Sequence, residues 1–163
     1  MFFVKRAGGF DPGPMFLVGH ETILVVSDEM SGLQAALNEA LSPSWSQRAR
    51  AGRDLASFAD VPVAAEALVG LLLDVADTAV TRQTAEALAR MGTMAAVRLV
   101  ALALAGADDS HGDWIQTGVL DALAGPEGVP DVAAVCRQLA RDPDAAVRRG
   151  AVEILEWVDG TTR

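Results

Sequence analysis

The chain has 163 residues, of which 51% are hydrophobic and 21% charged, and its formal net charge is −9 at pH 7. This balance excludes a disordered chain and predicts one ordinary domain with a substantial core. Uncharged runs are at most nine residues long, too short to span a membrane, and the start lacks the pattern of an export signal, so we expect a cytoplasmic protein.

Composition also favours helix over sheet. Aromatic residues make up 5% of the chain, Tyr is absent, and Ala and Leu are abundant. The single Cys136 excludes an internal disulfide. Residues 108–163 carry a net charge of −6, which would repel a phosphate polymer, so we do not expect a nucleic-acid partner.

Residues 1–43 form a separate N-terminal segment in this interpretation. Apolar and β-branched residues at 15–18 and 22–26 predict a short β-hairpin, with residues 2–4 as a third strand. Ser31 is then expected to cap a helix over residues 32–41, which Ser42-Pro43 ends.

The remainder of the chain contains an internal repeat. Placing Leu155 over Leu123, Leu88 and Leu55 aligns four segments with steps of 32, 35 and 33 residues. Each segment carries an apolar helical stripe, and a second helix is expected after each of the first three. The first helices are expected at 47–59, 80–92, 115–127 and 147–159, and the second helices at 61–76, 94–107 and 129–142.

Two helices in a period near 33 residues predict an all-α fold, a right-handed α-solenoid of about three and a half units over residues 44–158. Residues 159–163 are expected to form a short tail. The last unit lacks its second helix, which should leave Ile154 and Trp157 partly open. The N-terminal segment, a second copy or a partner would cover them, and self-association is the first of these to test.

The stretch "DPDAAVRRGAVEIL" resembles the HEAT-repeat signature in the short form typical of phycobilisome-lyase-type repeats, and "DTAVTRQTAEALARMG" matches it more loosely. The positions that carry the resemblance are Asp142, Pro143, Val147, Arg148, Ala151 and Leu155, with Asp77, Val80, Ala85, Leu88 and Gly92 in the second stretch. Repeats of this kind occur in many bacterial proteins, and the resemblance implies a protein-binding scaffold. In the family an Arg often pairs with an Asp of the neighbouring repeat, and here that position reads Arg48, Thr81, Gln116 and Arg148.

Two clusters could carry chemistry. The stretch "DDSHGDW" gathers Asp108, Asp109, His111 and Asp113, and a second cluster holds Arg48, Arg50 and Arg53. We interpret the first as a loop between helices, with Ser110 or Asp113 capping a helix that starts at Trp114, and the second as a solvated face. No catalytic, cofactor-binding or metal-ligating residue and no cofactor is assigned.

The sequence therefore favours a non-catalytic scaffold or adaptor that binds a protein partner with a basic surface, with a homodimer as a further expectation. The alternative is a small enzyme using the Asp108–Asp113 loop, or a nucleic-acid-acting protein using Arg48–Arg53. The candidate protein-binding residues are acidic side chains of the last units and two tryptophans, namely Asp108, Asp109, Asp113, Trp114, Glu153 and Trp157.

Overall fold

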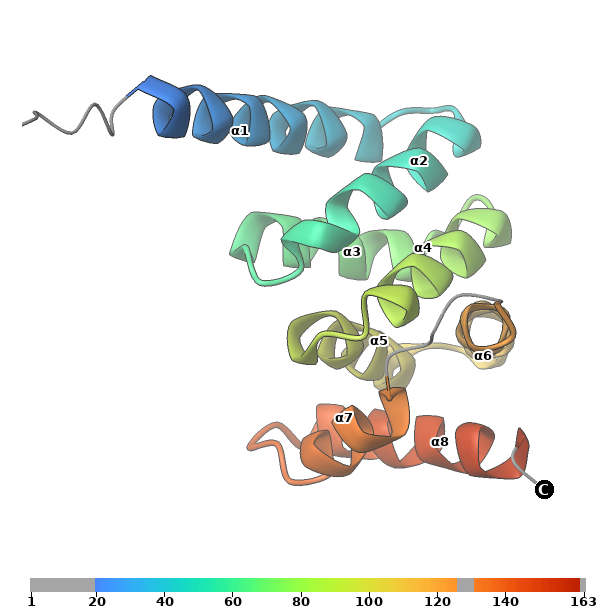
Figure 1. Ribbon diagram of the computed structural model, residues 1–163. Helices are drawn as coiled ribbons and strands as arrows, with labels where there is room; N and C mark the ends of the chain where they lie inside the picture. The colour runs from blue at the N-terminus through green and yellow to red at the C-terminus, as the bar shows by residue number, and fades with distance from the viewer. Residues whose placement is uncertain (1–19, 126–130, 162–163) are drawn as a thin grey trace, which may run out of the picture.

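A computed structural model describes residues 20–125 and 131–161, and the regular secondary structure in this part of the chain is all helical (Figure 1). The all-α prediction is confirmed. Within the described ranges there is no strand, and no helix is long and apolar enough to cross a bilayer. The helices are α1 (His20–Ala40), α2 (Trp45–Leu55), α3 (Pro62–Leu72), α4 (Thr78–Met91), α5 (Met94–Gly106), α6 (Asp109–Leu123), α7 (Val132–Leu139) and α8 (Ala145–Thr161), with a 3₁₀ turn, η1 (Ala56–Phe58), after α2.

The predicted N-terminal hairpin is not seen. Residues 22–26 lie in α1, while the other expected strands, at 2–4 and 15–18, fall outside the described residues. Ser31 lies inside this helix instead of capping it, and its hydroxyl donates to the Ser27 carbonyl at 2.9 Å. Leu33 and Ala36 are buried where α1 packs against α2. Strand propensity at 22–26 is outweighed because extending an existing helix costs less than nucleating a new element.

Side-chain caps fix where several helices begin. Asp77, Thr93, Asp108 and Asp131 each accept a hydrogen bond from an amide two or three residues further on. Pro62 is the first residue of α3, where its missing N–H is harmless. Gly92 ends α4 with a positive φ of 58°, which a residue with a side chain rarely adopts. Helices α2–α8 therefore fall on the seven helices expected between residues 47 and 159.

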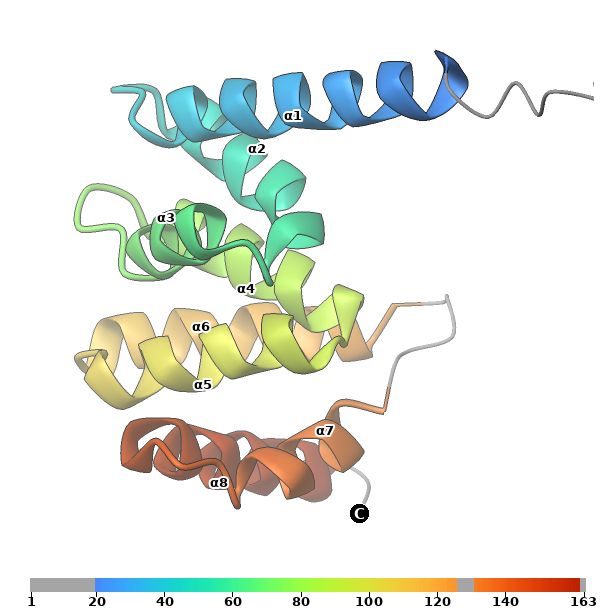
Figure 2. The same cartoon turned by 90° about the vertical axis from the view of Figure 1, so that its left-hand side faces the viewer.

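The helices stack in successive layers. Helices α2, α4 and α6 pack on one another in order, and α3 packs on α5 beside them (Figures 1 and 2). The aligned positions Ala51, Thr84, Val119 and Ala151 are all buried, as the repeat register predicts. Bringing helix axes close together requires small residues at the crossings. A Cβ on Gly118 would lie inside contact distance of the Arg82 carbonyl oxygen.

Helix α8 departs from the simple repeat. Its apolar stripe packs chiefly against α5 and α7, with little contact to α6. The α5–α8 crossing is so close that a Cβ on Gly150 would overlap the Ala101 carbonyl. The expectation that Ile154 is partly open is wrong, because it is fully buried in this packing. Trp157 is partly buried and packs against the core.

Candidate functional site

Five of the six candidate residues line one hollow, where α5 ends, α6 begins and α8 crosses below them. Its volume is about 280 Å³. We call it the acidic hollow, and it is lined by Leu104, Ala107, Asp108, Asp109, Gly112, Asp113, Gln116, Glu153 and Trp157. Four carboxylates and one indole thus share a small concave surface. No basic side chain is among its lining residues.

Three of these carboxylates come from the start of α6. The expected loop over 108–113 is wrong, because the helix begins at Asp109, five residues before Trp114. Asp108 is the cap, and its Oδ1 accepts from the His111 amide at 2.8 Å. Asp109 and Asp113 are four residues apart, so they stand on one face of the helix. Both side chains are exposed.

Helix α8 supplies the other side of the hollow. Glu153 and Trp157 are four residues apart, which again places them one above the other on one helical face. Partial loss of solvent around the carboxyl, with a smaller contribution from the neighbouring Glu156, raises the pKa of Glu153 above its ordinary value. The side chain therefore loses more solvation as a carboxylate than as an acid.

Trp114 does not join this group. It lies with the start of α4 at a separate hollow of about 180 Å³ lined by Asp77, Thr78, Ala79, Arg82 and Gln83. Its side chain is 37% exposed. The six candidate protein-binding residues are thus divided between two hollows. The acidic hollow still contains both carboxylates and an indole.

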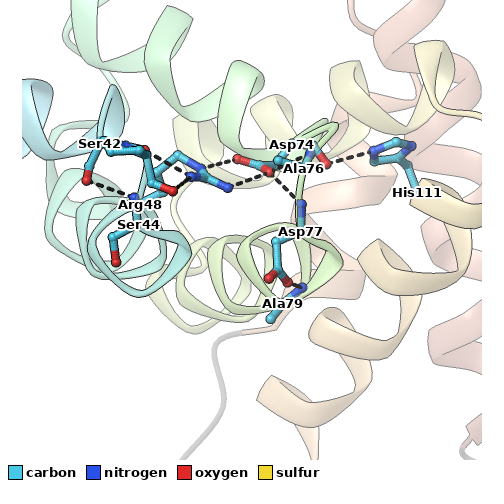
Figure 3. Close-up of polar contacts among 9 residues, drawn as sticks. Ser42, Ser44, Arg48, Asp74, Ala76, Asp77, Ala79 and His111 are labelled. Atoms are coloured by element: carbon cyan, nitrogen blue, oxygen red, sulfur yellow. Dashed lines mark hydrogen bonds and ion pairs between the residues drawn. The ribbon is translucent and has the colours of Figure 1, made fainter.

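His111 is not among the residues that line the acidic hollow, and it joins α6 to the loop between α3 and α4 (Figure 3). Its Nδ1 lies 2.7 Å from Asp108 Oδ1, and its Nε2 lies 3.1 Å from the Asp74 carbonyl oxygen. Both neighbours are acceptors, so the imidazolium, with two N–H groups, satisfies both. The neutral ring satisfies one. The hydrogen bond to Asp108, and next the one to Asp74, raise the pKa of His111 above its ordinary 6.5.

Asp74 is the centre of this network, and the sequence interpretation did not single it out. Its carboxylate accepts Nε and a second guanidinium N–H of Arg48 on α2, at 2.6 and 3.1 Å, and the amides of Ala76 and Asp77. Burial opposes the charged form of Asp74, but the hydrogen bonds from Arg48 and the two amides outweigh it and hold the pKa below 3.8. One loop residue thus links α2, α4 and α6.

A similar arrangement, in which a loop Asp accepts hydrogen bonds from an Arg side chain and a backbone amide, recurs before α8. Asp142 accepts Arg98 Nε at 2.9 Å and the Asp144 amide at 2.8 Å. Arg148 donates to the carbonyls of Asp142 and Pro143, just as Arg48 donates to those of Ser42 and Pro43. The signal was present in the sequence. In both "LLLDVAD" and "LARDPD" one Asp follows the second helix of a unit and another Asp precedes the next helix. The first stretch has one more residue between its two Asp residues, so the stretches do not align without a gap.

The arginine cluster is engaged within the chain. Arg48 pairs with Asp74, Arg50 forms an ion pair with Glu39, and Arg53 donates to Gln83.

Cys136 is fully buried on α7, and burial raises the pKa of its thiol to about 11, so it behaves as a small apolar side chain. No group of three or more His, Cys, Asp or Glu side chains in residues 20–125 and 131–161 is placed to hold a metal ion.

The pKa of His111 provides a direct test of this network. Because its folded-state pKa is raised, its stabilising contribution should be complete below about pH 6.5 and lost as pH rises through the folded value. NMR titration should place His111 above 6.5, with His20→Gln used to assign the two histidines. The thermal midpoint of His111→Gln should fall further below wild type at about pH 5.5 than at about pH 9. Equal losses at both pH values would show that the imidazolium is not the stabilising form.

Comparison of the chain with protein-family models, with curated proteins and with solved structures gave no match in any of the three.

Proposed function

We propose that this protein is a non-catalytic, HEAT-like helical-repeat scaffold that binds an arginine-bearing basic segment of a partner protein in the acidic hollow. The observation that carries the proposal is the convergence of Asp108, Asp109, Asp113 and Glu153 on one small hollow that Trp157 also lines. Asp113 of α6 and Glu153 of α8 are forty residues apart in the sequence, so folding is needed to bring them together.

The scaffold part of the proposal rests on the stacking of equivalent helices. Helices α2, α4 and α6 pack in order, and α3 packs on α5, and this order of contacts supports an α-solenoid. The repeated contacts of Arg48 and Arg148 with the carbonyls five and six residues before them support the equivalence of α2 and α8. The Arg48–Asp74 pair holds α2 to the loop between α3 and α4, where the next unit begins.

The choice of an arginine follows from the chemistry of the lining. A planar guanidinium pairs with a carboxylate through two parallel N–H groups and also stacks on an aromatic ring. The ammonium group of a lysine lacks the flat fork of donors, so it pairs with a carboxylate less specifically. The hollow offers both kinds of group within about 280 Å³, which suits one or two side chains rather than a whole small molecule. A net charge of −6 over residues 108–163 would speed the approach of a basic partner.

The proposal is tested with two labelled nonapeptides of equal charge, one rich in arginine and one rich in lysine, by fluorescence anisotropy. We expect the arginine peptide to bind more tightly, and binding to weaken as salt rises from about 50 to 500 mM. Asp109→Asn with Asp113→Asn should weaken it about five- to tenfold. This variant leaves the Asp108 cap in place.

The matched control is Asp54→Asn with Asp60→Asn, which removes the same charge from exposed positions near η1. Its affinity should stay within about twofold of wild type. If both double variants weaken binding equally, the peptide responds to net charge alone and the acidic hollow is not the site.

A further inference from the structure

The outward side of α8 is a helix face with no partner in the described structure. It is lined by Ala145, Arg149, Val152, Glu153, Glu156 and Gly160, all of them exposed, and it lies opposite the buried stripe of Val147, Ala151 and Ile154. Part of this face forms a hollow of about 620 Å³ with Ala140, Arg148 and Trp157. We call it the outer face of α8. Figures 1 and 2 show α8 in the last layer of the stack.

The order of residues along this face is self-complementary. In an antiparallel pair of α8 helices related by a two-fold axis between positions 152 and 153, each residue meets a definite partner residue. Ala145 meets Gly160 of the second copy and Arg149 meets Glu156, while Val152 and Glu153 lie on the two flanks of the contact, each beside the same residue of the second copy. Small residues meet small residues at both ends, where they let the helices approach, and opposite charges meet between them.

The charged groups on this face are available for such a contact. Within residues 20–125 and 131–161, neither Arg149 nor Glu156 forms a salt bridge or side-chain hydrogen bond. In the repeat alignment Val152 of α8 corresponds to Ala85 of α4. Ala85 is buried where α4 packs against α6, whereas Val152 is 48% exposed. A Cβ on Gly160 would meet nothing within 4 Å, so this end of the face is open.

From this pattern we infer that the protein forms a two-fold symmetric homodimer through the outer face of α8, with Arg149 of each copy paired to Glu156 of the other. The order of charges along this face complements a second copy of the same face, so the partner that we assign to it is another copy of the chain. A single helix-to-helix contact lies at the low end of interface sizes, below about 1,200 Å². We therefore expect a dissociation constant between about 10 μM and 1 mM.

The inference is tested by sedimentation equilibrium of the full chain alone, up to about 1 mM protein, in about 0.15 M salt so that repulsion between two chains of charge −9 is screened. Wild type should show a monomer–dimer equilibrium. Arg149→Glu and Glu156→Arg should each weaken the dimer at least about tenfold, since symmetry counts each change twice. The double variant Arg149→Glu with Glu156→Arg should restore it.

Arg141→Glu and Glu66→Arg are the matched controls, because they make the same charge changes at exposed positions outside this face. They should leave the dimer within about twofold of wild type. A wild type that stays monomeric, or a double variant no tighter than the single ones, overturns the inference. Glu153 borders both surfaces, but neither Arg149 nor Glu156 lines the acidic hollow, so such a result leaves the proposed function standing.

Discussion

Replacing Gly150 by alanine is expected to lower the free energy of unfolding by about 3 kcal/mol. The added Cβ would overlap the carbonyl oxygen, the carbonyl carbon and the Cα of Ala101 on α5. These are backbone atoms, so no side-chain rotation can relieve the overlap. Helices α5 and α8 must move apart, and the buried contacts of Ala151 and Ile154 beside the crossing are weakened as well. Urea denaturation monitored by circular dichroism measures the change.

The control is the same substitution at Gly32, inside α1. A Cβ there meets nothing within 4 Å, so Gly32→Ala should stabilise the protein by about 0.5–1 kcal/mol through helix propensity alone. Opposite signs at the two glycines would establish the α5–α8 packing. A neutral Gly150→Ala would mean that α8 does not cross α5 as described.

Asp74→Ala is expected to cost about 3 kcal/mol of stability, because it leaves Arg48 without its carboxylate partner. The two side chains are only 8% and 11% exposed, so water compensates little. The Ala76 and Asp77 amides lose their acceptor in the same step. Thermal denaturation at neutral pH gives the size of the effect.

Asp121→Ala is the comparison, because it removes an ion pair with Arg82 whose side chains are 45% and 35% exposed. That loss should stay below about 1 kcal/mol.

The pH dependence of stability is a second measurement of the role of Asp74. Asp74 has a lowered pKa, so its contribution is complete above pH 3.8 and is lost as pH falls through the folded value. In Asp74→Ala the free energy of unfolding should therefore fall less steeply than in wild type as the pH is lowered below about 3.8. The same steepness in both proteins would contradict the role assigned to Asp74.

The helices of the repeats could be predicted from the sequence because their signals are local. Apolar stripes at helical spacing, prolines at helix starts and Gly92 at a helix end all act within a few residues. The N-terminal interpretation failed for a related reason. Taken as an isolated segment, the β-branched residues at 22–26 predict a strand, whereas in the structure they continue a helix that Leu33 and Ala36 stabilise against α2.

The site could be predicted only in part. Asp108, Asp109 and Asp113 are neighbours in the sequence, so any fold would keep them together. Glu153 and Trp157 reach them because α8 crosses α5 at Gly150, which the repeat register does not predict. The links of Asp74 to Arg48 and His111 span 26 and 37 residues, and hydrogen bonds over such distances leave no periodic signal in one sequence.

The most direct test of the proposed binding site is a titration of the ¹⁵N-labelled protein with the arginine-rich nonapeptide, following the three tryptophan indole N–H signals by NMR. Trp157 lines the acidic hollow, whereas Trp45 and Trp114 lie on other parts of the structure. Assignment uses the three single Trp→Phe variants. We predict that the Trp157 signal shifts in a saturable manner while the other two stay in place. A shift confined to Trp45 or Trp114, or saturable binding with Trp157 unmoved, would contradict the proposal.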